Sequence, residues 1–352
     1  MLKRRAAEVG ERKKVLVAMS GGVDSSMSAK ALLERGFEPQ GVYLKLHPHE
    51  EKHAANIEKG RKVAAYFGFE HHVLDMREEF KERVYKPFIE TYKEGKTPNP
   101  CTFCNRHLKF GALLDFADRL GCEFLATGHY IRTDGQFFYE ANDMTKDQSY
   151  FLFNVKKEAL KRLIFPLADR YKTEVKKTAA AIPELAFLAV QAESAEICFV
   201  ETDYIDIIGK HYQVEQEGEV VDEKGAPIGT HKGYMQYTIG KRRGFTVNGA
   251  KEPLYVQNII PESNKIVVTT KDRVYKKEFN IEKTNLFLEP TQKEFRALIK
   301  VRYRNEKKQG LVSLGENGYA KIVLDEPEFA IAPGQAAVFY EDNKVLGGGY
   351  IV

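Results

Sequence analysis

The chain has 352 residues, enough for two or three domains with sizeable hydrophobic cores. Its 54 Lys and Arg against 50 Asp and Glu leave a formal net charge of +4, which excludes a uniformly basic surface. No run approaches the roughly 18 consecutive apolar residues of a transmembrane helix, so we expect no membrane among its partners. The basic segment at residues 1–14 lacks the apolar core of a secretory signal, and we expect a frayed tail there.

Short apolar runs alternate with segments of helical spacing through the first part of the chain. His71 and His72 are expected at the surface, close to the start of the third strand. The alternation predicts an α/β fold in which helices cover both faces of a doubly wound parallel sheet. The predicted strands are Lys14–Met19, Gln40–Leu46, Val73–Met76 and Glu123–Thr127, and the predicted helices are Asp24–Arg35, Lys52–Phe67, Arg77–Lys93 and Asn105–Leu120.

The pattern changes after a short helix predicted at Tyr204–Tyr212. From Gly218 onward, short strand-like runs are separated by turn signals such as Asn248-Gly249 and Asn317-Gly318. One or two small β domains therefore follow the α/β domain, with a boundary between them near residues 270–280.

A glycine-containing string, Ser20–Ser26 (SGGVDSS), lies between the first strand and the first helix. Its two glycines let the backbone turn tightly, and the free N–H groups of the loop and helix start favour a phosphate. The hydroxyls of Ser20, Ser25 and Ser26 add donors, and Asp24 is placed to orient a loop amide or to hold Mg²⁺. A merely capped helix start would explain an isolated Gly-Gly, but the full string at the carboxyl end of a strand favours the phosphate site.

The loop differs from two common nucleotide-binding loops. The chain has no G-x-x-x-x-G-K-S/T string, which disfavours the usual phosphoryl-transfer NTPases, and no G-x-G-x-x-G after the first strand, which disfavours a dinucleotide oxidoreductase. The string instead resembles the pyrophosphate-binding loop of the ATP pyrophosphatase superfamily. That resemblance implies cleavage of ATP between its α- and β-phosphates and adenylation of a substrate oxygen.

Four cysteines are too few for a disulfide scaffold and fit a reducing cytoplasm. Cys101 and Cys104 form a C-x-x-C pair that enters a helix behind Thr97–Pro100, and a helix N-terminus favours thiolates. A structural zinc site is disfavoured because no second C-x-x-C or close Cys/His pair completes it. Cys122 is expected to be a small buried hydrophobe, and Cys198 lies far along the chain.

Six motifs in order make the resemblance specific. After the phosphate loop come T-P-N-P-x-x-x-C-N, A-T-G-H-Y at Ala126–Tyr130, K-D-Q-S-Y-F-L at Lys146–Leu152, E-I-C-F at Glu196–Phe199 and G-T-H-K-G-Y-x-x-Y-T-I-G-x-R-x-G at Gly229–Gly244. From about Lys14 to Val352 the chain resembles the bacterial tRNA-specific 2-thiouridylase (MnmA) family. The resemblance implies an ATP pyrophosphatase domain at 1–203, a central tRNA-binding domain at 204–275 and a C-terminal β-barrel at 276–352.

The resemblance also implies a reaction. ATP, with Mg²⁺, adenylates the carbon-2 oxygen of the wobble uridine in tRNAs for Lys, Glu and Gln, and sulfur then displaces AMP. The sulfur comes from a sulfur-donor protein or a cysteine desulfurase in the cytoplasm.

Site residues are implied position by position. Cys104 matches the first catalytic cysteine, and Cys198 matches the one that carries a persulfide. The expected ATP contacts are Ala18, Met19, Ser20, Gly21, Gly22, Val23, Asp24, Ser25, Leu44 and Gly128. The expected target-base and tRNA contacts are Asn99, Pro100, Cys101, His129, Lys146, Asp147, Gln148, Arg302, Tyr303 and Gln335.

Cys101 departs from the usual pattern, because many members have Asp at this position. Either Cys101 is a neutral packing residue beside a persulfide relay of Cys104 and Cys198, or the three thiols act as a set. Three thiolates suit a 4Fe–4S cluster with one open iron, and spacing alone does not decide between these possibilities.

Two segments concentrate positive charge. His231–Phe245 contains four Lys or Arg and no acid, interleaved with aromatic residues, and Arg296–Gly310 has a net charge of +5. A single patch is commonly a solvated strand face, but two patches together with an adenylating loop favour nucleic-acid binding. The alternatives are another amidating or ligating enzyme with the same loop, which would not need the cysteines, and a non-catalytic tRNA-binding protein, which would not need an intact loop.

Overall fold

The computed structural model describes residues 12–191, 197–200 and 203–352, and the chain divides into two compact units. The first unit comprises Met1–Phe80, Asn105–Ser149 and Val155–Glu193, and the second comprises Lys81–Cys104, Tyr150–Asn154 and Ser194–Val352. Most of the expected tail, residues 1–11, lies outside the described residues. The domain boundaries predicted after residues 203 and 275 remain a prediction.

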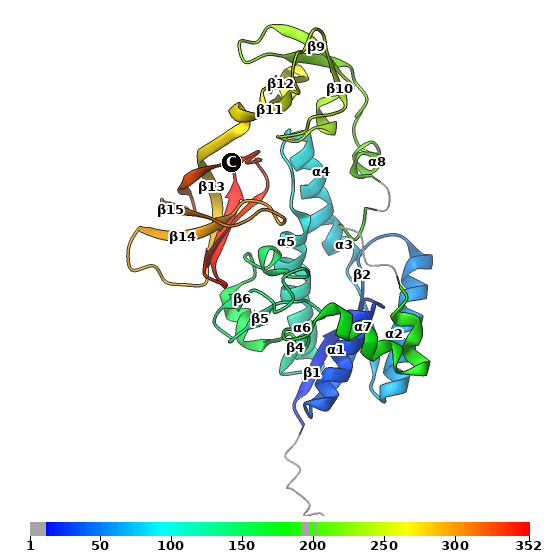
Figure 1. Ribbon diagram of the computed structural model, residues 1–352. Helices are drawn as coiled ribbons and strands as arrows, with labels where there is room; N and C mark the ends of the chain where they lie inside the picture. The colour runs from blue at the N-terminus through cyan, green and yellow to red at the C-terminus, as the bar shows by residue number, and fades with distance from the viewer. Residues whose placement is uncertain (1–11, 192–196, 201–202) are drawn as a thin grey trace, which may run out of the picture. The chain divides into compact units, whose positions relative to one another are not determined.

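The first unit is built on a parallel sheet in the order β3-β2-β1-β4-β7 (Figure 1). The strands are β1 (Lys14–Ala18), β2 (Glu38–Lys45), β3 (His71–Asp75), β4 (Phe124–Ala126) and β7 (Leu163–Ile164). The strand order reverses at β1, because β2 pairs with one of its edges and β4 with the other. Such a reversal opens a crevice at the carboxyl ends of the strands, where open α/β sheets bind ligands.

Strand β1 forms because its apolar run is covered on both faces. Val15, Leu16 and Val17 are all fully buried, as expected for a central parallel strand. One face shares a core with α1 (Val23–Glu34) and α7 (Lys172–Ala180). The other principal helices of this unit are α2 (Glu50–Phe67), α3 (Arg77–Phe80) and α6 (Leu113–Arg119). The predicted doubly wound parallel fold is confirmed.

Two helices expected to be continuous contain π-helical stretches. The first includes a π-helix at Lys81–Tyr85 before α4 (Lys86–Lys93), and the second follows α5 (Pro100–Cys104) with a π-helix at Asn105–Ala112. The helices predicted over Arg77–Lys93 and Asn105–Leu120 are therefore confirmed, and their π-helical stretches were not predicted. Insertions of π-helix are uncommon and are found frequently at functional sites.

The remaining elements of the first part of the chain are short. Strands β5 (Arg132–Thr133) and β6 (Phe138–Tyr139) form a hairpin, and 3₁₀ segments occupy Ser149–Phe151, Lys157–Arg162 and Pro183–Leu188. Helix α8 (Tyr204–Ile208) is capped by the Asp203 side chain, which accepts from the Ile205 N–H. No helix among the described residues is both long enough and apolar enough to span a bilayer.

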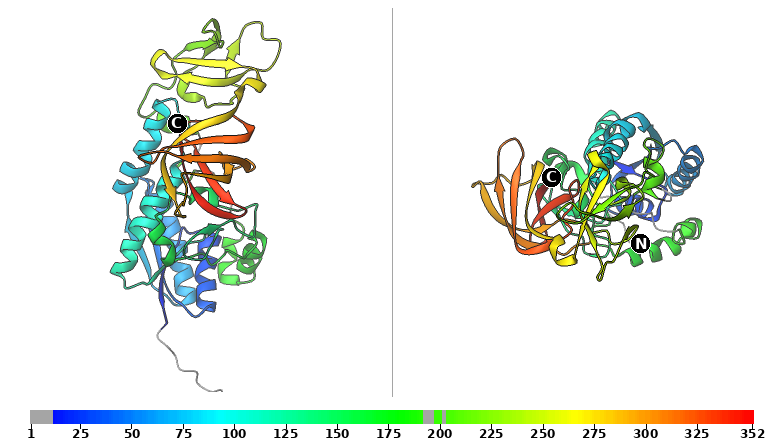
Figure 2. Two further views of the ribbon diagram at one scale, coloured as in Figure 1. Left: turned by 90° about the vertical axis from the view of Figure 1, so that its left-hand side faces the viewer. Right: turned by 90° about the horizontal axis from the view of Figure 1, so that it is seen from above.

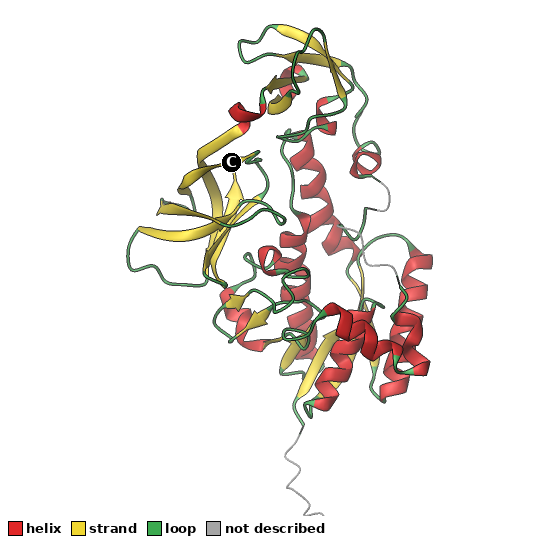
Figure 3. Ribbon diagram, in the orientation of Figure 1, coloured by secondary structure: helices red, strands yellow, loops and turns green. Residues whose placement is uncertain are grey.

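Within the second unit, strands dominate from β8 onward (Figure 3). A small sheet has the order β10-β9-β8-β12-β11 and its own apolar core. Its strands are β8 (Gly218–Val221), β9 (Pro227–His231), β10 (Phe245–Val247), β11 (Tyr255–Ile260) and β12 (Lys265–Thr269). The predicted central β-rich region is confirmed.

The last strands close into a barrel in the order β13-β16-β15-β14-β17-β18, because β13 also pairs with β18 (Figure 2). They are β13 (Tyr275–Leu286), β14 (Glu294–Lys300), β15 (Lys308–Leu314), β16 (Ala320–Phe329), β17 (Ala336–Glu341) and β18 (Lys344–Ile351). The closure leaves these strands without a free edge between β13 and β18. The expected C-terminal β-barrel is confirmed.

Candidate functional site

The phosphate loop links β1 to α1 and is folded by its own hydroxyl groups. Ser25 Oγ and Ser26 Oγ donate to the Gly22 carbonyl at 3.1 and 2.9 Å, and the Ser20 N–H donates to Ser25 Oγ at 3.2 Å. Gly21 has a φ of +81°, which a residue with a Cβ rarely adopts. Gly22 is the N-cap of α1 and has no side chain to satisfy the first amides of the helix. Those amides are available to an anion, as in other helix N-terminal phosphate sites.

Gly128 follows β4 and lies against the same loop. A Cβ on Gly128 would be 2.9 Å from both the Asp24 carbonyl carbon and the Ser25 nitrogen. Backbone atoms at that distance exclude any side chain, so only glycine allows the β4 end to approach the loop this closely. The structure thus brings two separately predicted nucleotide-contact segments together at the reversal of strand order.

The other expected ATP contacts lie on the same edge of the sheet. Ala18 ends β1, Met19 is buried directly after it, Val23 begins α1, and Leu44 is near the carboxyl end of β2. Their role in ATP binding remains a prediction, but their placement at neighbouring strand ends is compatible with it.

Asp24 has two partners that the sequence did not reveal. Its carboxylate accepts from Lys172 Nζ at 2.5 Å and from the Tyr130 hydroxyl at 2.8 Å. The Lys172 side chain is 11% exposed and that of Asp24 is 31% exposed, so the pair is partly shielded from water, which strengthens its attraction relative to a fully exposed pair. Tyr130 is the last residue of the A-T-G-H-Y string, which follows a strand, and Lys172 begins α7. These two positions were the features of the sequence that could have pointed to partners of Asp24.

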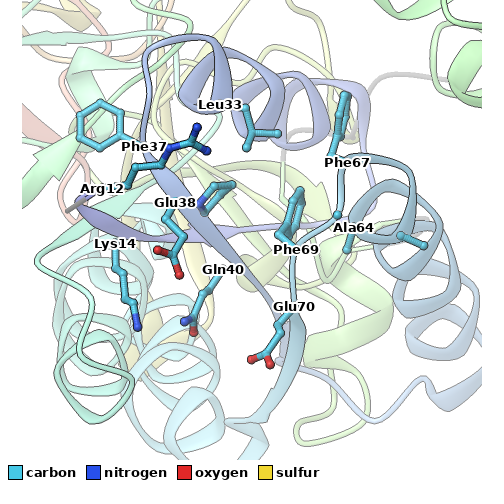
Figure 4. A pocket seen from close by; sticks show the side chains of 13 residues that line it. Arg12, Lys14, Leu33, Phe37, Glu38, Gln40, Ala64, Phe67, Phe69 and Glu70 are labelled. Atoms are coloured by element: carbon cyan, nitrogen blue, oxygen red, sulfur yellow. The ribbon is translucent and has the colours of Figure 1, made fainter. Parts of the chain in front are cut away.

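A separate hollow of about 650 Å³ opens at the opposite, amino-terminal edge of this sheet (Figure 4). It is lined by apolar side chains such as Phe37 and Phe69, with Lys14, Glu38 and Glu70 among its polar residues. Because Lys14 and Glu38 begin β1 and β2, the hollow is remote from the loop that follows β1. It is not the nucleotide site.

The expected tRNA contacts at 146–148 are held within a network of local hydrogen bonds. Gln148 Oε1 accepts from the Tyr130 N–H at 3.0 Å, and the Gln148 N–H donates back to the Tyr130 carbonyl. Asp147 is buried and accepts from the Ala141 N–H and from Ser149. Lys146 is half-buried in the same turn. The K-D-Q segment therefore has a structural function beside its predicted contact with tRNA.

His129 is half-buried, and its ring lies against Phe110 and Phe165. Its Nδ1 is 2.7 Å from the Thr127 hydroxyl, and burial lowers the pKa of the imidazole well below its usual value. A neutral imidazole offers RNA a hydrogen bond rather than a charge.

In the second unit, Asn99, Pro100 and Cys101 lie at the start of α5, and Cys104 is its last residue. Cys104 is 5% exposed and Cys101 is half-buried. The loop before this helix is held by Gln335, whose amide donates to the carbonyls of Thr97 and Pro98 at 3.1 and 3.0 Å. Gln335, an expected tRNA contact, therefore also supports the predicted target-base segment.

Cys198 lies in a turn that is anchored by the next residue, Phe199. The Val200 N–H donates to the Ile197 carbonyl at 3.1 Å, which places Cys198 and Phe199 at the two central positions. Cys198 is exposed, whereas the Phe199 ring is buried edge-on against Phe88 and Tyr85, with centroids 5.2 and 6.0 Å apart. The preceding residues 192–196, which include Glu196 of the E-I-C-F motif, lie outside the described residues.

The three thiols, as placed here, do not fit the ligand set of a 4Fe–4S cluster. Across the described ranges, no three His, Cys, Asp or Glu side chains converge closely enough to hold a metal ion. Cys104 is buried while Cys198 faces solvent. Cys122 is buried, as expected, and burial raises the pKa of its thiol.

Arg302 and Tyr303, the remaining expected tRNA contacts, follow β14. Arg302 Nη2 donates to the Ile239 carbonyl at 3.0 Å, and desolvation lowers the pKa of the guanidinium. The Tyr303 ring lies 4.6 Å from that of Phe151, and Lys300 Nζ lies 5.7 Å from its centroid. Tyr303 thus presents a half-buried aromatic ring beside a cation, a combination suited to stacking on a nucleobase.

Comparison with protein families agrees with this architecture. Residues 13–202 match a model described as a tRNA methyl transferase HUP domain, 205–270 a tRNA methyl transferase PRC-barrel domain and 276–351 an aminomethyltransferase beta-barrel domain. The sheet and its phosphate loop define the class as a nucleotide-binding protein of the ATP pyrophosphatase type.

Curated relatives resolve the family. A protein of Nitratiruptor sp. named tRNA-specific 2-thiouridylase MnmA is 56% identical over 97% of this chain and 99% of its own length. A protein of the same name from Sulfurimonas denitrificans is 52% identical over 96% of this chain and 98% of its own. The chain belongs to the tRNA-specific 2-thiouridylase (MnmA) family.

Two solved structures of tRNA-modifying enzymes show a distant likeness to this chain. The U34-tRNA thiolase NcsA from Methanococcus maripaludis, with its 4Fe–4S cluster, has a TM-score of 0.36 and 19% identity, over 57% of this chain and 66% of that one. A 4-thiouridine synthetase in complex with RNA and ATP has a TM-score of 0.34 and 18% identity, over 51% and 42%.

Proposed function

We propose that this chain is an ATP-dependent tRNA-uridine 2-sulfurtransferase that acts on the wobble uridine of tRNAs for Lys, Glu and Gln. The observation that carries the proposal is the pairing of a preformed phosphate loop with an exposed cysteine, Cys198, and a buried one, Cys104. The name methyl transferase in the family models denotes a different reaction. The thiols favour sulfur transfer, as the names of the full-length relatives do.

The first step activates the base. The loop from Ser20 to Ser25 binds the phosphates of ATP, taken as its Mg²⁺ complex, with Asp24 as the nearby carboxylate. The carbon-2 oxygen of uridine attacks the α-phosphorus, and pyrophosphate leaves. Adenylation turns a poor leaving group, an oxide, into AMP.

The second step transfers sulfur. An external sulfur-donor protein or cysteine desulfurase loads Cys198, which is exposed on its turn, as a persulfide. The terminal sulfur attacks carbon 2 and AMP leaves. Cys104 then attacks Cys198 Sγ, so the S–S bond to the transferred sulfur breaks as the Cys104–Cys198 disulfide forms. An external thiol reductant restores both cysteines.

The remaining site residues are proposed contacts. Asn99, Pro100 and Cys101 meet the target base, and the tRNA body is contacted by His129, Lys146, Asp147, Gln148, Arg302, Tyr303 and Gln335. Cys101 acts as a neutral neighbour of Cys104 in this scheme. We place the enzyme in the cytoplasm, together with its proposed tRNA substrate.

The test uses three cysteine variants of the purified enzyme with tRNA, ATP and a persulfide source. We expect Cys198→Ser and Cys104→Ser to form AMP-tRNA, detected by radiolabel, but no 2-thiouridine in nucleoside mass spectrometry. Cys122→Ser is the matched control, because Cys122 is buried just before β4 and takes no part in the scheme. It should thiolate at the wild-type rate.

Two outcomes would overturn the proposal. Detectable 2-thiouridine from Cys198→Ser would remove the persulfide role, and unchanged 2-thiouridine in cells lacking the protein would favour a ligase or a non-catalytic tRNA-binding protein. Iron and sulfide analysis after anaerobic purification tests the cluster separately. Near-stoichiometric iron that disappears in Cys101→Ser would replace the relay by a cluster.

A further inference from the structure

The two residues between Cys101 and Cys104 both contact one side chain of the barrel. Thr102 Oγ1 is 2.6 Å from the hydroxyl of Tyr350, on β18, and Phe103 stacks on the Tyr350 ring with centroids 4.9 Å apart and planes at 12°. Thr102 is fully buried and Tyr350 is 5% exposed. Tyr350 of the barrel therefore contacts both central residues of the C-x-x-C segment.

The hydrogen bonds at this contact run in one direction. Thr102 Oγ1 donates its single proton to the Asn99 carbonyl at 2.8 Å, so it accepts from the Tyr350 hydroxyl. The Tyr350 oxygen in turn accepts from Asn154 Nδ2 at 2.9 Å. The chain Asn154, Tyr350, Thr102, Asn99 has every donor directed toward the next acceptor, an arrangement in which each bond polarises the following one. It ends at the predicted target-base segment.

Helical geometry relates the contacts of Thr102 and Phe103 to the orientation of the two thiols. Cys101 and Cys104 are three residues apart and so share one side of α5, whereas Thr102 and Phe103 are displaced from that side. Fixing Thr102 and Phe103 on Tyr350 consequently fixes the rotation of the short helix about its axis. α5 continues directly into the π-helix at Asn105–Ala112, so that helix supports its C-terminal end. Its N-terminal turn, which carries Cys101, has no preceding helical turn and depends on tertiary contacts such as those with Tyr350.

We propose that Tyr350 is a positioning residue for Cys101 and Cys104. Its hydroxyl and ring hold the C-x-x-C helix so that Cys104 stays buried in the orientation from which it attacks Cys198. The effect on sulfur transfer rests on the proposed function, whereas the effect on thiol accessibility does not.

The test is a double-mutant cycle of Tyr350→Phe and Thr102→Val, which remove the two ends of one hydrogen bond while keeping side-chain size. Alkylation of each cysteine is followed by mass spectrometry without ATP or tRNA. We expect Cys104 to be alkylated about tenfold faster in each single variant, and single-turnover sulfur transfer to slow by about tenfold. Each variant also removes one hydrogen bond of its own, to Asn99 or from Asn154, so the effect of the double variant should be larger than either single effect but clearly smaller than their sum, because the shared hydrogen bond is lost only once.

Two further variants separate positioning from loss of stability. Thr102→Ser retains the hydroxyl and should restore the wild-type alkylation rate. Tyr340→Phe removes a hydroxyl from a buried tyrosine of β17 and should leave Cys104 unchanged.

The inference on Tyr350 is overturned if the two single effects add in the double variant, or if Tyr340→Phe exposes Cys104 as much as Tyr350→Phe. If the wild-type enzyme makes no 2-thiouridine, the proposed function fails. The alkylation cycle then still decides the role of Tyr350.

Discussion

Lys172 and Asp24 are 148 residues apart in sequence, yet the ammonium of the first lies 2.5 Å from the carboxylate of the second. Tyr130 adds its hydroxyl to the same carboxylate. The charge of the Asp24 carboxylate is thus compensated by a side chain that lies far from the phosphate loop in the sequence.

We predict that Asp24→Asn abolishes adenylation and lowers the free energy of unfolding, since Lys172 is left unpaired. The loss should be about 2 kcal/mol, below the range for fully buried pairs because Asp24 keeps 31% of its side chain exposed. The double variant Asp24→Asn with Lys172→Met should regain most of the stability but no activity. Urea unfolding and pyrophosphate release measure the two effects. Recovery of pyrophosphate release in the double variant would contradict a chemical role for Asp24.

Phe199 gives a second prediction. Phe199→Ala removes the ring that seats the Cys198 turn against Phe88 and Tyr85, so sulfur transfer should slow by about tenfold while adenylation is unchanged. Phe199→Leu should recover part of the rate. Because the chain has no tryptophan, Phe199→Trp provides a single emission signal, which should be that of a water-shielded indole. An emission spectrum typical of exposed indole would show that the ring is not seated.

The basic segment 231–245 contains lysine and arginine in two different situations. Lys241 Nζ donates to the Gln236 carbonyl at 2.7 Å and lies over the Tyr237 ring. Desolvation lowers the pKa of Lys241. Arg242 and Arg243, in contrast, are exposed. We predict that Arg242→Ala and Arg243→Ala make the plot of log tRNA affinity against log salt concentration less steep. The slope should change by about one unit for each phosphate that is no longer neutralised. Lys241→Ala should mainly lower the melting temperature. Measuring tRNA affinity over a range of salt concentrations tests this prediction. An equal change of slope in Lys241→Ala would contradict the distinction between the half-buried lysine and the exposed arginines.

His71 makes the first unit sensitive to acid. Its ring lies in the space left by Gly60 and Gly41. Neither ring nitrogen has a hydrogen-bond partner among the described residues. Burial lowers the pKa of His71 from 6.5 to about 4. Between these two pH values the unfolded chain binds more protons than the folded one, so stability falls as the pH decreases from 6.5. The slope from this group is at most about 1.4 kcal/mol per pH unit, and partial exposure of the ring reduces it.

Urea unfolding at about pH 7 and about pH 5, on either side of the ordinary imidazole pKa, tests this. His71→Leu should reduce the difference between the two pH values, and the neighbouring His72→Gln should not. Equal pH dependence in His71→Leu and the wild type would remove His71 as the cause.

The sequence predicted the parts of the fold that depend on local pattern. The run from Lys14 to Ala18 and the SGGVDSS string placed the first strand, the loop and the first helix almost to the residue, because burial on both faces and glycine turns leave clear signals. The π-helices at Lys81–Tyr85 and Asn105–Ala112 were not predicted, since their extra residue per turn is set by tertiary packing.

Long-range partners account for the rest. Lys172 and Tyr130 were missed as partners of Asp24 because nothing near the loop marks them. His71 was expected at the surface at the start of the third strand; it does begin β3, but it is half-buried, because Gly41 and Gly60 make room for its ring. The expected persulfide and target-base residues were placed by resemblance, and their roles remain predictions.

The hydrogen bond between Thr102 and Tyr350 joins residues 248 positions apart, so closing it requires one of the longest loops that this chain forms. Contacts of such separation form late, because the loop entropy is given up before the contact compensates for it. The orientation of the C-x-x-C helix therefore depends on β18, at the far end of the sequence from β1. A substitution in this last strand can alter the thiol pair without touching the segment that contains it.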